Sequence, residues 1–346
     1  MGGSRRPARV TSHDVATEAG VSQATVARVF SSPEKVADTT RTRVLAVADR
    51  VGYVPNAIAR SLKAQRTDIV GAVVPATGEY WQNVLTSFSR VLIDRRKQLL
   101  LFSFDAVEQV NHVLETVLQY QLDGLILASA NITANQLVGV AQSGLPVVAF
   151  NQPAAKDLIA SVTVDNELGM SQLANHVAER GARSALFIGG IAKASTDQSR
   201  FRGAASALGR HGIACPYVEA GAFSYEAGYK VARSLVDAEL PDAIMVGSDE
   251  VAFGVIDGLR EAGIETPHDV LITGFDGLPQ ASWAGYDLTT LEQPTELLVD
   301  HAVEHVLEPR RDDASSAEAP TEPHSTAYPY IVVPGTIREG RTTDNA

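Results

Sequence analysis

Most of the chain alternates short apolar runs with stretches of helical periodicity. Apolar residues of those stretches recur three or four positions apart, as in Phe253, Ile256 and Leu259. Apolar runs followed by amphipathic helices are typical of parallel sheets buried on both faces. The runs form two groups: IVGAVV (69–74), LLLFSF (99–104), DGLILA (123–128) and PVVAF (146–150), then ALFIGG (185–190), AIMVGS (243–248) and VLITGFD (270–276). We therefore predict an α/β domain of two doubly wound parallel-sheet lobes, with ligands at the carboxyl ends of the strands.

The first 55 residues follow a different pattern, with short helical stretches separated by polar residues and a glycine. Residues 14–19 fit a short helix, and Gly20 can adopt the left-handed conformation that often ends one. Ser22 is a good N-cap for a second helix, because its hydroxyl can accept from free N–H groups of the first turn. A third helix is predicted from Thr39 to the residue before Gly52. This segment is therefore predicted to be an all-α domain.

The second helix of this segment has two distinct faces. Val26 and Val29 point inward, whereas Gln23, Ala24 and Arg28 fall on the opposite face. Two short helices around a glycine turn, with Gln and Arg exposed on the second, are typical of a helix-turn-helix that enters a DNA major groove. The alternative is a small helical bundle that does not bind DNA.

A hinge is predicted after Pro55. Asn56 can cap a short helix over residues 57–62, with Ala59 on its small-residue face and Leu62 as its large exposed apolar side chain. So short a helix is marginal in water, because nucleation is costly. Leu62 could wedge between base steps from the minor groove. The alternative is an ordinary linker in which Leu62 packs on the rest of the protein.

Charge is divided unevenly along the chain. The 346 residues carry a net charge of −12, which on its own argues against a nucleic-acid binder. Residues 1–66, however, hold 11 Lys and Arg against 5 Asp and Glu, a net +6, and the remaining 280 residues carry −18. A basic head on an acidic body favours DNA binding by the head, because Lys and Arg contacts to phosphates supply most non-specific affinity.

The cysteine content and the lengths of the apolar runs indicate the cellular compartment. Cys215 is the only cysteine, so no internal disulfide can form. The N-terminus has no apolar signal-peptide stretch, and no run reaches the ~20 apolar residues that span a bilayer. We expect a soluble, cytoplasmic protein that does not bind membranes.

The motifs of the head carry a family resemblance. The order DVAxxAGVSxATVxRVF, then TRxRVLxVAxxVGYVPNAIARSLK, resembles the DNA-binding head and hinge of the LacI/GalR family of bacterial transcription regulators. The resemblance implies that the second helix reads the major groove through Gln23, Ala24 and Arg28. It assigns helix-cap or backbone contacts to Thr11, Ser22, Thr25 and Asn56, and insertion at the operator centre to Leu62. Ala27 and Ser31 depart from the usual Ser and Asn of the family, and each change removes a phosphate contact.

The body resembles the effector domain of that family, which is related to periplasmic sugar-binding proteins. The motifs that carry this resemblance are GLPVVAFNQ, VTVDNELGM, SRFRGAASAL, GSDEVAFGVIDGLREAGI, GFDG and LTTLEQP. The architecture implies three crossings between lobes, near 162–164, 288–291 and 328–332. The predicted domains are a headpiece (1–55), a hinge (56–66), an effector and dimerisation domain (67–340) and a free tail (341–346). Lobe 1 would comprise about 67–163 and 291–327, and lobe 2 about 164–290 and 328–340.

The resemblance also marks candidate effector-binding residues. Tyr80 and Trp81 match positions that stack on ligand, with plain packing as the alternative. Arg200 matches a ligand-binding arginine whose planar guanidinium suits vicinal hydroxyls or a carboxylate, with a surface salt bridge as the alternative. Asp276 ends a strand where its carboxylate can accept from sugar hydroxyls. The remaining candidates are Phe223, Ser248, where the family commonly has Asn, and Asp165 at a lobe crossing.

The sequence thus predicts a homodimeric transcription regulator that binds a pseudo-palindromic DNA operator. Such proteins are more often repressors than activators. A small-molecule effector, a sugar or related metabolite, would control it by closing the cleft; corepression and activation stay open. A transport protein is disfavoured by the missing signal peptide. No GxxxxGK[ST], GxSxG or HExxH occurs, and the histidines show no metal-ligand spacing, so we expect neither enzyme activity, metal nor cofactor. Asp249 and Glu250 open a helix, which the helix dipole explains better than acid–base chemistry.

Overall fold

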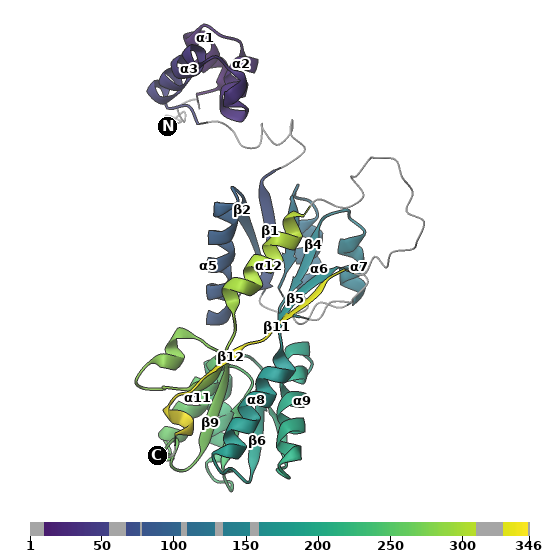
Figure 1. Cartoon of the computed structure of the whole chain (residues 1–346), viewed down its shortest axis with the longest axis vertical. Helices are drawn as coiled ribbons and strands as arrows, with labels where there is room; N and C mark the ends of the chain where they lie inside the picture. The colour runs from purple at the N-terminus through teal and green to yellow at the C-terminus, as the bar shows by residue number, and fades with distance from the viewer. Residues whose placement is uncertain are drawn as a thin grey trace, which may run out of the picture. The chain divides into compact units, whose positions relative to one another are not determined.

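The structure, a computed structural model, divides into two compact units, Met1–Thr67 and Asp68–Ala346. It describes residues 10–54, 67–76, 78–104, 109–128, 134–152, 159–308 and 328–344. The predicted hinge residues Asn56, Ala59 and Leu62 lie outside the described residues. Figure 1 shows the helices of the first unit and the helices and strands of the second.

The first unit is a helical domain. Its elements are α1 (Ser12–Ala19), α2 (Gln23–Ser31), the 3-10 turn η1 (Pro33–Lys35) and α3 (Asp38–Val51). The inward-facing valines of the helices form its core, with Val15, Val26 and Val44 fully buried. Phe30 and Tyr53 pack their rings against each other beside this core, with centroids 5.8 Å apart. The predicted helix-turn-helix is therefore an independently packed domain.

Helix caps fix the turn between α1 and α2. Thr11 and Asp14 form a capping box at the start of α1, in which each side chain accepts from the backbone N–H of the other residue. Gly20 has a φ of 64°, a left-handed conformation in which glycine has no Cβ penalty. Ser22 Oγ then accepts from the Thr25 N–H at 3.1 Å, at the start of α2. These caps set the angle at which α2 leaves the turn.

The second unit contains two six-stranded sheets. The first has the order β11-β5-β4-β3-β1-β2, and its recorded pairings are all parallel. Helices α5 and α12 pack together, and α6 and α7 contribute to a second apolar core. The strands are β1 (Ile69–Pro75), β2 (Gln98–Phe104), β3 (Gly124–Leu127), β4 (Val147–Phe150), β5 (Ala160–Val164) and β11 (Tyr330–Val333). The helices are α5 (Glu79–Asp94), α6 (Val110–Val117), α7 (Ala134–Ala141) and α12 (Thr295–Leu307). We call this part lobe 1.

The second sheet has the order β12-β10-β9-β8-β6-β7 and forms lobe 2. All its recorded pairings are parallel except that of β12 with β10. Helix α8 packs on α9, and α10 packs on α11. The strands are β6 (Ala185–Gly189), β7 (Tyr217–Glu219), β8 (Ala243–Val246), β9 (Leu271–Asp276), β10 (Thr289–Glu292) and β12 (Thr336–Arg338). The helices are α8 (Asn166–Glu179), α9 (Ser195–Arg210), α10 (Tyr225–Leu235) and α11 (Asp249–Arg260), with short turns η3 (Pro279–Ser282) and η5 (Arg341–Thr343). The predicted fold class is confirmed.

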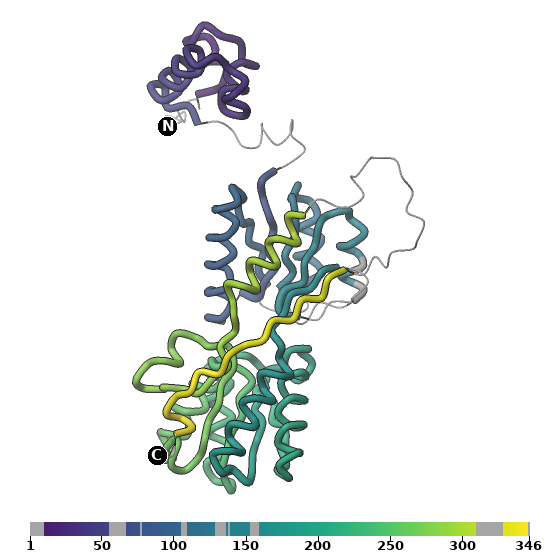
Figure 2. The backbone as a smooth tube through the Cα atoms, in the orientation of Figure 1, coloured from purple at the N-terminus to yellow at the C-terminus, as the bar shows by residue number. Residues whose placement is uncertain are grey.

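The chain passes between the lobes three times, and two crossings lie later than predicted. The first lies at Asp165, between β5 and α8. The second follows β10 at residues 293–294, and the third lies at residues 334–335, between β11 and β12 (Figure 2). Strand β11 pairs with β5, so residues 330–333 belong to lobe 1 and not to lobe 2 as predicted. The local sequence of residues 330–333 contains no information about which sheet accepts this strand.

Residues 341–344 are not the free tail that the sequence predicted. Thr342 and Thr343 are buried in turn η5. The Thr289 backbone N–H donates to Thr342 Oγ1 at 2.9 Å, and the Thr289 and Thr343 hydroxyls are 2.7 Å apart. Arg341 pairs with Asp287 at 2.9 Å. Polar residues resemble a tail in sequence, but here the Thr342 hydroxyl accepts from a backbone N–H of β10 and the Thr343 hydroxyl bonds the Thr289 side chain.

This contact predicts that Thr342→Val destabilises the second unit by about 1–3 kcal/mol, because it leaves the buried Thr289 N–H without an acceptor. Trp81 and Trp283 are the only tryptophans and both lie in this unit, so urea unfolding followed by tryptophan fluorescence reports on it. Thr336→Val, at an exposed threonine of β12, is the control. Equal stability of the two variants would contradict the role of the Thr342 hydroxyl.

Candidate DNA-binding face and effector site

The outer face of α2 presents the residues that were predicted to read DNA. Gln23, Ala24 and Arg28 are exposed, whereas Val26 and Val29 are buried on the opposite face. A helix held by one face over a capped turn can place the other face in a major groove. Bidentate donors such as Arg and amides such as Gln suit the edges of guanine and adenine.

Thr11, Ser22 and Thr25, which were predicted to hold caps or the DNA backbone, take part in hydrogen bonds at helix N-termini. Thr11 caps α1 and Ser22 caps α2, and the hydroxyls of Ser22 and Thr25 are 2.9 Å apart. These hydroxyls lie at helix N-termini, where free N–H groups attract phosphate. Their capping role holds α2 in place, and contact with DNA remains a prediction for each of them.

In the second unit, Arg200 of α9 lies buried where the two lobes meet. Its Nε donates to Asn166 Oδ1 at 2.7 Å, and its Nη1 donates to the Gly247 carbonyl at 2.5 Å. Its Nη2 is 3.4 Å from Asp276 Oδ1, and the guanidinium stands 3.8 Å from the centre of the Phe275 ring. At 3% exposure, Arg200 forms no surface salt bridge, which was the alternative interpretation.

Asp276, at the end of β9, links Arg200 to lobe 1. Gln293 Nε2 donates to Asp276 Oδ1 at 2.7 Å, and the Tyr80 hydroxyl of α5 donates to Gln293 Oε1 at 3.0 Å. We call this chain of contacts, Tyr80–Gln293–Asp276–Arg200–Asn166, the junction network. Asp276 also has a φ of 129°, a conformation that residues with a side chain rarely adopt. Such backbone strain clusters at functional sites.

Burial controls the ionisation of the junction network. It raises the pKa of Asp276 to about 7; Arg200 opposes the rise, and the nearby Asp249 carboxylate adds to it. Burial likewise raises the pKa of the Tyr80 hydroxyl, so Tyr80 stays a hydrogen-bond donor. Burial therefore favours the protonated form of both side chains, and at Asp276 the charge of Arg200 opposes this effect.

Ser248 and Asp249 are structural residues of the same region. Ser248 caps α11 by accepting from the Val251 N–H, and it is buried. The Asp249 carboxylate accepts from the Thr290 hydroxyl at 2.6 Å and from the Leu278 N–H at 2.7 Å. Burial raises the pKa of Asp249 to about 6. The Asp249 carboxylate thus links the start of α11 to the loop that follows Asp276 and β9.

The other predicted effector residues, Trp81, Phe223 and Asp165, lie in different surroundings. Trp81 is half-buried, with its ring edge-on to Tyr80 (5.1 Å) and to Phe150 (6.5 Å), so packing accounts for much of its surface. The ring of Phe223 closes over Gly190, where an added Cβ would lie 2.3 Å from it. Asp165 caps α8 by accepting from the Leu168 N–H and lines a separate hollow between α8 and α9. The structure does not bring Asp165 into the junction network.

Three polar residues at a strand end or a helix start escaped the sequence-based selection. Asn166 and Gln293 belong to the junction network, and both lie in motifs quoted for the resemblance, VTVDNELGM and LTTLEQP. Asn151 follows β4, has a φ of 55°, and is buried with its Oδ1 unpartnered among the described residues. In the sequence, Asn151 could have been selected because it is an amide directly after a predicted strand, in the motif GLPVVAFNQ.

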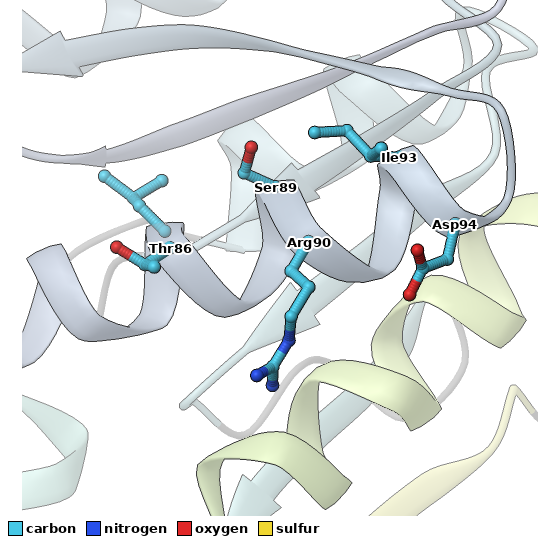
Figure 3. A pocket seen from close by; sticks show the side chains of 6 residues that line it. Thr86, Ser89, Arg90, Ile93 and Asp94 are labelled. Carbon is cyan, nitrogen blue, oxygen red and sulfur yellow. The ribbon is translucent and has the colours of Figure 1, made fainter.

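The hollow on α5 lies away from these residues. A groove of about 530 Å³ runs along that helix, lined by Leu85, Thr86, Ser89, Arg90, Ile93 and Asp94 (Figure 3). Arg90 pairs across it with Glu296 of α12 at 2.6 Å. None of the predicted effector residues lines this groove.

Within the described ranges, no three or more His, Cys, Asp or Glu side chains gather where they could hold a metal ion. No helix of that part of the chain combines the length and apolar character needed to cross a membrane.

The two units together define a class of protein: a DNA-binding head joined to a two-lobed domain of the ligand-binding type. Family models agree with both parts. Residues 11–56 match bacterial regulatory proteins of the lacI family, and residues 174–333 match a periplasmic binding protein-like domain.

Individual proteins extend the match over most of the chain. Catabolite control protein A of Priestia megaterium is 31% identical over 291 residues, which cover 82% of this chain and 88% of that protein. Catabolite control protein A of Staphylococcus epidermidis is 29% identical over 289 residues, with the same coverage. The chain belongs to the lacI family of bacterial regulatory proteins, and it is a DNA-binding transcriptional regulator.

Solved structures share the fold. The lac repressor dimer bound to operator and the anti-inducer ONPF aligns with a TM-score of 0.84 at 21% identity, covering 97% of this chain and 99% of that chain. The transcriptional regulator CelR in complex with cellobiose aligns with a TM-score of 0.67 at 24% identity, covering 96% and 100%.

The raised pKa of Asp276 predicts a pH-dependent stability. Between the ordinary aspartate pKa of 3.8 and the folded value of about 7, the folded chain holds a proton that the unfolded chain has released. This carboxyl therefore makes the second unit lose stability as pH rises through that window. Asp276→Asn should flatten this dependence, measured by urea unfolding with tryptophan fluorescence at pH 4.5–7.5. Asp300→Asn, at an exposed site on α12, should keep it; an unchanged slope in Asp276→Asn would contradict the assignment.

Proposed function

We propose that this protein is a cytoplasmic repressor, without enzyme activity, that binds a pseudo-palindromic operator as a homodimer. The observation that carries the proposal is the outer face of α2, where Gln23, Ala24 and Arg28 are exposed over a capped helix-turn-helix. A dimer of such heads reads two half-sites related by the protein's two-fold axis. The predicted hinge residues Asn56, Ala59 and Leu62 would complete the contact with DNA.

We further propose that a small uncharged metabolite such as a sugar binds at the lobe junction and controls DNA binding. Asp276 and Asn151 offer carboxylate and amide acceptors at the ends of β9 and β4, which suits a ligand that donates hydroxyl hydrogen bonds. Arg200 is already bonded to three protein acceptors, so its role is to hold Asp276 in place. The CelR complex with cellobiose is a sugar complex of this fold and supports this class of ligand.

Binding of the effector must favour one arrangement of the lobes to change operator affinity. In the repressor interpretation the effector lowers that affinity. A corepressor would instead raise operator affinity. In an activator, the effector would raise operator affinity or leave it unchanged while transcription increases. An operator titration with and without effector separates these cases.

The DNA-binding proposal is tested by selecting bound DNA from random sequence with the full chain. We expect a motif with two-fold symmetry. Arg28→Ala should then lower discrimination at one base pair of each half-site by about 1–3 kcal/mol, because a guanidinium contact to a base edge is lost. Fluorescence anisotropy on single-substitution operators measures this effect.

Arg43→Ala is the matched control, because it removes the same charge from an exposed site on α3. It should weaken all sequences alike through the loss of charge. A uniform loss in Arg28→Ala as well would mean that Arg28 contacts only phosphate.

The effector proposal predicts a weakened response in Tyr80→Phe. The substitution removes only the hydroxyl that bonds Gln293 across the lobes, so effector binding should weaken by about 0.5–1.5 kcal/mol. The effector, found by screening neutral sugars and nucleosides against the operator complex, is titrated by calorimetry. Tyr328→Phe, an exposed tyrosine, is the control. Identical effector affinity in Tyr80→Phe and Tyr328→Phe would place the effector site elsewhere.

A further inference from the structure

Helix α5 of lobe 1 begins without a cap from its own sequence. Its N-cap residue is Gly78, which has no side chain to accept from the free N–H groups of the first turn. Helices usually solve this problem with Ser, Thr, Asp or Asn at that position. In this chain the acceptor comes from the other lobe.

Glu250 of lobe 2 supplies the missing cap. Its Oε1 accepts from the Glu79 N–H at 2.5 Å, and the Tyr80 N–H also donates to this carboxylate. Glu250 stands in the first turn of α11, a helix that Ser248 already caps. One carboxylate therefore serves the N-terminal turns of two helices in different lobes, where both helix dipoles favour negative charge.

The fit around this carboxylate is close. Gly78 has a φ of 109°, and an added Cβ would lie 3.3 Å from Glu250 Oε1. Tyr80, in the same first turn of α5, makes a second contact across the junction, because its hydroxyl donates to Gln293. Two consecutive residues of α5 thus hold the lobes together by hydrogen bonds.

The groups around the Glu250 carboxylate act on its charge in opposite directions. Burial raises the pKa of Glu250, and the acidic side chains of Asp276 and Glu79 add to the rise; the Glu79 and Tyr80 N–H groups oppose it. A half-buried carboxylate beside like charges is costly unless those N–H groups stay in place. If the lobes separated, Glu250 would return to water and α5 would lose its cap.

We propose that Glu250 is a latch between the lobes: its carboxylate caps α5 across the junction and holds lobe 1 in register with lobe 2. It is a positioning residue, because it acts through α5 and the junction network. Resting on the proposed function, this latch is the contact through which effector binding and lobe movement are coupled.

The test is hydrogen–deuterium exchange of the full-length protein, without DNA or effector, read by mass spectrometry. In Glu250→Ala, the amides of Glu79 and Tyr80 in lobe 1 should exchange at least about tenfold faster, because their acceptor has been removed. The first turn of α11, where the substitution itself lies, should keep its protection, since Ser248 still caps Val251. A residue that only stabilised its own helix would give the opposite pattern.

Two further variants complete the experiment. Glu250→Gln keeps an acceptor oxygen without the charge, so it should give a smaller increase at the same amides, and it provides the test if Glu250→Ala fails to fold. Glu226→Ala removes an exposed glutamate from the first turn of α10 and should change nothing at α5. Unchanged exchange at Glu79 and Tyr80, or an equal increase throughout both lobes, would overturn the latch. Because the experiment uses neither DNA nor effector, its failure would leave the proposed regulator function standing.

Discussion

The buried contact between the Arg200 guanidinium and the Asp276 carboxyl is the interaction on which the organisation of the lobe junction depends. A buried guanidinium is tolerated only when it is paired and hydrogen-bonded, and removing one partner of a buried pair typically costs about 3–5 kcal/mol. Here the guanidinium is also bound by Asn166 and the Gly247 carbonyl and stacks on Phe275. These partners come from α8, the end of β8 and β9. One arginine therefore fixes the ends of several elements that face lobe 1.

The same pair reaches lobe 1 through a short path. Gln293 joins Asp276 to the Tyr80 hydroxyl, and Glu250 caps the turn that carries Tyr80. Both contacts end on the first turn of α5, so a change at the junction acts on that helix first. Strand β1, which precedes α5, is the first element of the second unit after the predicted hinge. The junction contacts on α5 therefore lie close in sequence to the predicted hinge.

Much of this organisation could be predicted from local sequence patterns. Apolar runs and helical periodicity predicted the two-sheet fold, and Gly20 and Ser22 predicted the turn before α2, because these are local effects. The sheet that accepts β11, the burial of Thr342 and Thr343, and the placement of Asp165 could not be predicted. Each depends on partners far away in sequence: β5, Thr289 and the hollow between α8 and α9. The family resemblance selected Arg200 and Asp276, whose mutual contact the pattern alone does not reveal.

The proposed effector site at the lobe junction and the DNA head are expected to be thermodynamically coupled. Reciprocity tests this coupling, through the effector affinity measured by calorimetry on free and on operator-bound protein. Operator should change effector affinity by the same factor by which effector changes operator affinity. Equal effector affinity for the free and the operator-bound protein would contradict it.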